Sequence, residues 1–105
     1  MIPAVYIMMT ESQDITYRTK VALVIRAART ALGWSQEELA KRASVSKPTI
    51  ARIEMSGISP RADTLNTLMQ VFKAQGVEVE MGDSEVLIKY KSSALLTLQN
   101  HLGAK

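Results

Sequence analysis

Two short helical segments that follow one another with almost no chain between them constrain this fold most. Ser35 opens the first as an N-cap, and Glu38 completes a capping box, in which the serine bonds the Glu38 amide and the glutamate reaches back. Ser46 opens the second, with Pro48 in its first turn, where a missing N–H costs little. Only residues 44–45 separate the segments, and so short a turn permits little except a steep helix crossing.

The side chains of these segments complete a helix-turn-helix. Ala40 is small enough to let the two helices approach closely. The wedge between them is filled by Leu39, Val45, Ile50 and Ile53. The second helix keeps an exposed polar face of Ser46, Lys47, Thr49 and Arg52, flanked by Pro48. Such a helix fits the major groove of DNA, where these side chains reach base edges and phosphates.

Weaker signals place the other elements. Apolar residues recur at helical spacing from 15 to 32 and again from about 60 to 75, which predicts two further helices. Residues 77–91 alternate apolar and charged side chains around a Gly-Asp pair, which predicts a β-hairpin. Opposite charges are expected to face one another across it: Glu78 and Glu80 against Lys89 and Lys91. Residues 93–102 predict a short amphipathic helix.

These elements divide the chain into three expected parts. Residues 1–14 are a lead-in, in which Ala4 to Met9 favour a short strand. Residues 15–76 form the helix-turn-helix domain. Residues 77–105, the hairpin and last helix, form an appendage for dimerisation or for binding a partner.

Composition excludes several classes of function. The 105 residues include no cysteine and one histidine, His101, so a thiol nucleophile, a disulfide framework and a Cys- or His-rich metal site are excluded. We therefore expect no enzyme activity, no metal and no cofactor, and the lack of cysteine fits a reducing cytoplasm. The longest apolar run has six residues, against the roughly 20 that span a bilayer, so no membrane segment is expected.

The charge is unevenly distributed. Residues 17–61 carry nine Lys and Arg against three Glu, a net charge of +6. The rest of the chain carries four cations and seven anions, a net charge of −3. A basic segment of this kind indicates a polyanionic partner, although many soluble domains carry a solvated basic face.

The motif resembles the XRE family, the lambda-repressor-like and Cro-like helix-turn-helix domains. The resemblance covers residues 20–76 and rests on LGWSQEELAKRASVSKPTIARIE at 32–54 and SPRADTLNTLMQVFKAQG at 59–76. It implies a compact bundle of four or five helices. The expected fold is therefore mainly α, a lambda-repressor-like helix-turn-helix bundle with a C-terminal β-hairpin and a short C-terminal helix.

The resemblance also implies residue roles. Lys47, Pro48 and Arg52 occupy base-facing positions, and Gln36 resembles a residue that contacts phosphate and supports the recognition helix. Arg29 and Glu54 match an internal, structural ion pair. The candidate DNA-binding residues are Gln36, Ser46, Lys47, Pro48, Thr49, Arg52 and Ser35, with Arg61 and Arg42 as weaker phosphate contacts. Arg52 is the expected guanine reader.

Five positions invite a second interpretation. The turn residue that relatives often hold as glycine is Ser44, which can adopt a positive φ at some cost, so we expect the turn to survive. The glycine expected just after the recognition helix is displaced to Gly57, so the loop over 56–59 is left undefined. Trp34 is expected to pack rather than to stack on bases. Glu37 and Glu38 are expected to be capping and solvated residues of the helix, not a catalytic acid/base pair.

These features predict a cytoplasmic, nucleoid-associated, sequence-specific regulator that binds double-stranded DNA. A homodimer acting as a repressor on a palindromic operator, including its own promoter, is expected, because one recognition helix reads only a few base pairs. The alternative is an antitoxin-type interaction protein that binds a partner through residues 77–105 and autoregulates through the helix-turn-helix. A domain that has lost DNA binding is a further alternative.

Overall fold

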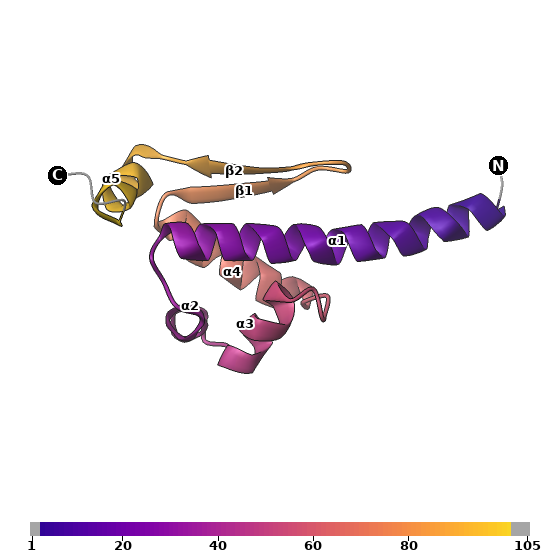
Figure 1. Ribbon diagram of the computed structural model, residues 1–105, viewed down its shortest axis with the longest axis horizontal. Coiled ribbons are helices and arrows are strands. Elements are labelled where there is room, and N and C mark those ends of the chain that lie inside the picture. The colour runs from indigo at the N-terminus through magenta and orange to yellow at the C-terminus, as the bar shows by residue number, and fades with distance from the viewer. Residues whose placement is uncertain (1–2, 102–105) are drawn as a thin grey trace.

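The computed structural model describes residues 3–101 (Figure 1). Its elements are α1 (Pro3–Ala31), α2 (Gln36–Ala43), α3 (Lys47–Glu54), α4 (Ala62–Ala74), β1 (Val77–Met81), β2 (Val86–Tyr90) and α5 (Ser92–His101). The predicted fold class is confirmed: the chain is mainly helical and ends in a β-hairpin followed by a short helix. The predicted last helix extended to residue 102, which lies outside the described residues.

Helix α1 is longer than the sequence predicted. It begins at Pro3 and runs through Ala4 to Met9, so the strand expected there is wrong. Residues 4–32 contain neither glycine nor proline, and a proline at the first helical position is well tolerated. Once residues 15–31 are helical, each added residue gains a hydrogen bond without a new nucleation step. The N-terminal part of α1 therefore continues past the tip of the hairpin (Figure 1).

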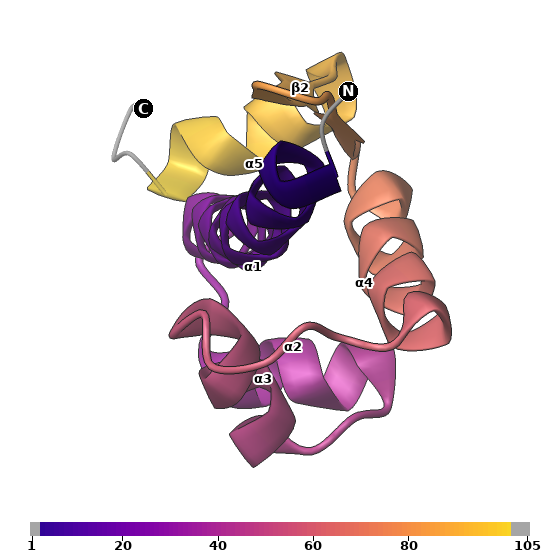
Figure 2. The same ribbon diagram turned by 90° about the vertical axis from the view of Figure 1, so that its right-hand side faces the viewer.

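The core lies around the C-terminal half of α1. Helices α2 and α3 cross α1 on one side, α4 packs beside it, and the hairpin and α5 cover the side opposite α3 (Figure 2). The largest fully buried side chains come from all of these layers: Phe72, Ile25, Leu32, Leu39, Ile50, Ile53, Leu68, Val21, Val24 and Val77. Ala40 is also buried, which lets α2 and α3 cross closely.

Two serines hold the left-handed backbone positions that end the motif helices. Ser44 caps α2 with φ 56° and ψ 42°, and its N–H bonds the carbonyls of Ala40 and Lys41. The turn therefore forms without glycine, as predicted. After α3 the left-handed residue is Ser56, at φ 60°, and not Gly57.

We expect Ser44→Gly to raise the free energy of unfolding by about 0.5–1 kcal/mol, because glycine has no Cβ to oppose a left-handed backbone. Urea denaturation followed by circular dichroism measures this change. Ser59→Gly is the matched control, because Ser59 is exposed and has no positive φ. It should leave stability unchanged or lower it through the entropy of the unfolded chain. Equal stability of the two variants would show that Ser44 stores no strain.

The hairpin packs one face on the core and pairs charges on the other. Its register places Glu78 opposite Lys89, while the ion pairs run diagonally. Lys89 Nζ lies 2.7 Å from Glu80 Oε2, and Lys91 Nζ lies 3.3 Å from Glu78 Oε2. The hydrogen bond to Glu80 raises the pKa of Lys89 above its usual value. The prediction that opposite charges face one another across the strands is confirmed.

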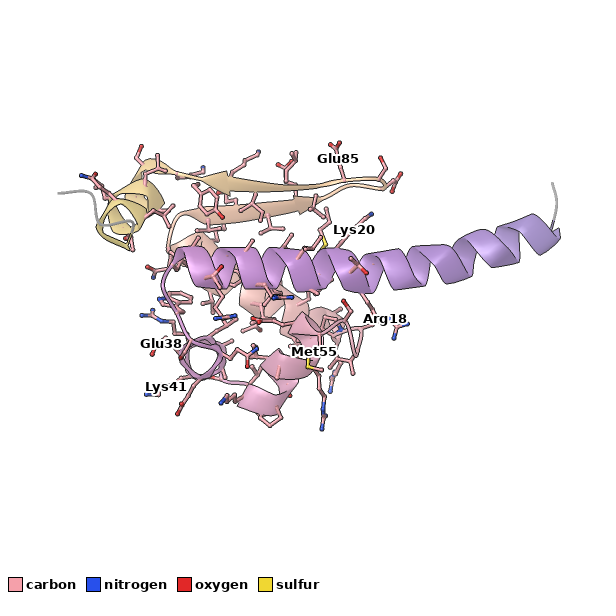
Figure 3. All side chains as sticks on the ribbon, in the orientation of Figure 1. Arg18, Lys20, Glu38, Lys41, Met55 and Glu85 are labelled. Carbon is pink, nitrogen blue, oxygen red and sulfur yellow. The ribbon has the colours of Figure 1, made fainter. Side chains whose placement is uncertain are left out.

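Besides the apolar packing of the hairpin, close contacts at both of its ends hold the hairpin and α5 on the bundle. Lys20 of α1 donates from Nζ to the carbonyl oxygens of Gly82 and Asp83, both at 2.6 Å, at the hairpin tip (Figure 3). At the other end, Gly76 has a φ of +84°, and a Cβ there would lie 2.9 Å from the backbone nitrogen of Ala94. Only glycine therefore fits where α5 meets the end of α4.

Candidate nucleic-acid interface

Helix α3 is fixed at its start by its own side chains. Ser46 is the N-cap, and its Oγ accepts a hydrogen bond from the Thr49 N–H at 3.2 Å. The two hydroxyl oxygens lie 2.7 Å apart and share a second hydrogen bond. Pro48 occupies the first turn, as predicted. Ser46 and Thr49, both candidate DNA contacts, therefore also define where the recognition helix begins.

The two faces of α3 differ sharply. Ile50 and Ile53 are fully buried, and Glu54 is only 4% exposed. On the outward side, Lys47, Pro48 and Arg52 are exposed, while Thr49 and Ala51 are half-buried. In the part of the chain that the structure describes, neither cationic side chain has an ion-pair or hydrogen-bond partner. Both are thus available to an external polyanion.

A buried carboxylate sets the angle of α3. Glu54 accepts two hydrogen bonds from Arg29 of α1, from Nε to Oε2 at 2.6 Å and from Nη2 to Oε1 at 2.9 Å. Gln36 of α2 donates from Nε2 to Oε1 at 3.0 Å. Arg29 Nη1 also donates to the carbonyl of Trp34 at 2.7 Å. One carboxylate therefore joins α1, α2 and α3 at a fixed geometry.

The position of Gln36 was not fully anticipated. The resemblance implied a phosphate contact, and the structure places its amide against Glu54 and leaves the side chain half-buried. The two residues are 18 positions apart and lie on different helices, so no periodicity within a single element could have paired them. The Arg29–Glu54 pair, which the resemblance did imply, is present.

Arg42 lies against an aromatic pair. Its guanidinium stands 4.1 Å from the centroid of the Trp34 ring, and that ring stacks on Phe72 with centroids 6.1 Å apart. Arg42 Nε also bonds Glu38 Oε2 at 2.8 Å. The Glu38 carboxylate therefore binds Arg42. Of the two hydrogen bonds of the predicted capping box, the structure shows the one in which the Ser35 Oγ accepts from the Glu38 N–H at 3.0 Å. Trp34 packs within the protein, as expected.

Arg61 lies on the loop between α3 and α4. It is the N-cap residue of α4 without a side-chain cap, and its guanidinium is 3.3 Å from the Asp63 carboxylate. Both side chains are largely exposed, so the pair contributes little to stability and is readily exchanged for another anion.

Comparison with known families decides what this arrangement is. A family model described as helix-turn-helix matches residues 25–78, about half of the chain, from the end of α1 into β1. The chain belongs to the XRE-type helix-turn-helix family. It is therefore a DNA-binding transcription regulator, and the predicted family is confirmed. A search of the curated proteins found no match.

This family is one of regulatory DNA-binding domains and not of enzymes. Among the helices that the structure describes, none is both long enough and apolar enough to cross a membrane. Over the same residues, no cluster of three metal-ligating side chains is present.

Proposed function

We propose that this XRE-type regulator is a homodimeric repressor that binds a palindromic operator with one α3 from each subunit, including the operator of its own promoter. One observation carries the proposal. The outward face of α3 holds two cations, Lys47 and Arg52, that have no partner among the described residues, while hydrogen bonds to Glu54 hold its inward face. A rigid helix with a free cationic face suits readout of bases in the major groove.

The proposed roles follow from the position of each side chain. Arg52 reads a guanine and Lys47 a neighbouring base edge. The other contacts set the position on the phosphates, as such contacts commonly do. They are Gln36, Ser46, Thr49 and Ser35, with weaker contributions from Arg61 and Arg42, while Pro48 packs against the groove.

A dimer is proposed because α3 is short. Its eight residues span about 12 Å at 1.5 Å per residue, which covers only a few base pairs. Two such helices about 34 Å apart read a longer site. A dimer bound over a promoter excludes the polymerase, so repression needs no surface beyond α3 and a dimer contact. The proposed location of the protein is the cytoplasm, at the nucleoid.

The proposed dimer contact lies in residues 77–105. Leu95 and Leu96 of α5 are 53% and 69% exposed, while Ala94 anchors the helix in the core. The same exposed leucines support a second candidate function, an antitoxin-type protein whose partner covers α5 while α3 regulates its own gene. The two functions differ in whether the purified chain is itself a dimer.

Fluorescence anisotropy with DNA from upstream of the gene tests the proposal. We expect tight binding that resists excess non-specific competitor, with two chains per site by light scattering. Leu96→Asp should give monomers and weaken operator binding, whereas Leu23→Asp, at a leucine of α1 that is 55% exposed, should do neither. Binding that disappears with competitor and falls steeply with salt would show phosphate contacts alone. A monomer that still binds the site would favour the antitoxin-type function.

A further inference from the structure

Among residues 17–99, Met55 is the most exposed large hydrophobic residue, at 78%. It stands at the C-cap of α3, and its N–H bonds the Ala51 carbonyl at 3.1 Å. The next two residues are also held, since the N–H groups of Ser56 and Gly57 bond the carbonyls of Ile53 and Arg52. The backbone is therefore fixed while the Met55 side chain is in solvent.

The place of Met55 on α3 is informative, because a single exposed methionine elsewhere would need no explanation. Pro48, Arg52 and Met55 follow one another at spacings of four and three, which aligns them along one stripe of a helix. All three are exposed. Figure 3 shows Met55 directed away from α1, on the free side of α3. The exposed stripe that is proposed to enter the groove therefore continues from Arg52 to the apolar side chain of Met55.

The major groove presents one chemical group that suits an apolar side chain such as that of Met55. The hydrogen-bond donors and acceptors of base edges interact only weakly with a thioether, which is at best a weak acceptor. Thymine alone presents a methyl group there. Methionine is unbranched and flexible, so it adapts its shape to a small apolar target. Along the axis, Met55 lies about 5 Å beyond Arg52, one to two base pairs away.

We infer that Met55 is a specificity-determining residue that contacts the C5-methyl group of a thymine beside the base read by Arg52. The inference rests on the proposed function and extends it to a named base. It predicts that methyl removal and side-chain truncation act on the same contact.

Deoxyuridine substitution tests this contact, because it removes only the thymine methyl. A binding site is first selected from random DNA with the full chain, and each thymine is then replaced in turn. For the wild-type protein, we expect one replacement per half-site to weaken binding about 4-fold, the effect of one buried methyl-sized group. Met55→Ala should bind the selected site more weakly and be indifferent to that replacement.

Two further variants separate contact from folding. Met55→Leu should keep the sensitivity to that methyl group, and Leu23→Ala, at another exposed apolar residue, should keep the complete wild-type pattern. Equal sensitivity of wild type and Met55→Ala at every thymine would overturn the inference and leave the proposed function standing. So would a site at which no thymine methyl matters, which would fit an apolar protein partner for Met55. Failure to select any site would overturn the proposed function and the inference together.

Discussion

Arg29→Ala is expected to lower the free energy of unfolding by about 3–5 kcal/mol, because it strands a buried carboxylate. The Glu54 side chain is 3% exposed and that of Arg29 is 14% exposed, so little water can replace the lost guanidinium. The single bond from Gln36 would remain. Since small domains are stable by only about 5–15 kcal/mol, this loss is a large part of the total. Urea denaturation followed by circular dichroism measures it.

The control is another arginine of the same helix. Arg26 is exposed, and Arg26→Ala should change stability by no more than about 0.5 kcal/mol. The double variant Arg29→Met with Glu54→Leu should recover part of the loss, because it removes both charges and keeps apolar volume. If Arg29→Ala were as mild as Arg26→Ala, the buried pair would not be what fixes the angle of α3.

The parts of the fold that the sequence predicted are those set by nearby residues. Ser35 and Ser46 cap their helices through amides three residues ahead, and Gly33 and Gly76 adopt the positive φ expected where a helix ends. Such caps and periods act within one or two turns, so they are visible in a linear chain. Proline at the start of α3 belongs to the same class.

The parts that the sequence did not predict depend on contacts between distant residues or on neighbouring structure. The β-prone run Ala4 to Met9 is helical because it continues an existing helix. Lys20 belongs to the basic segment that the charge pattern assigns to a polyanionic partner, but its side chain binds the hairpin tip, more than 60 residues away in the sequence. Gln36 meets Glu54 only after α2 and α3 have crossed. No spacing rule connects positions that only the tertiary fold brings together.

In the candidate interface, too, features set by nearby residues could be predicted, and features set by distant contacts could not. The exposed face of α3 follows from helical periodicity around Ile50 and Ile53, so Lys47 and Arg52 could be singled out from the sequence. The packing of Arg42 on Trp34 could not, because it depends on where Phe72 of α4 lies. Roles on DNA for all of these residues stay predictions.

Arg52→Ala is expected to abolish specific operator binding while leaving the fold intact. Arg52 is exposed and has no partner among the described residues, so its removal costs the folded protein little. A bidentate contact to guanine contributes about 1–3 kcal/mol of discrimination, and both half-sites of a dimer lose it together. Anisotropy titrations with operator and scrambled DNA measure the ratio of the two affinities, and a thermal melt checks the fold.

Two variants distinguish base readout from charge. Arg52→Lys keeps the positive charge but lacks the planar pair of donors, so it should retain binding to scrambled DNA and the salt dependence while losing the preference for the operator. Arg61→Ala should weaken operator and scrambled DNA by similar factors, because a phosphate contact carries no sequence information. If Arg52→Lys preserved the operator preference, charge alone would account for Arg52. If Arg52→Ala preserved it as well, the base reading would have to come from Lys47 or from another part of α3.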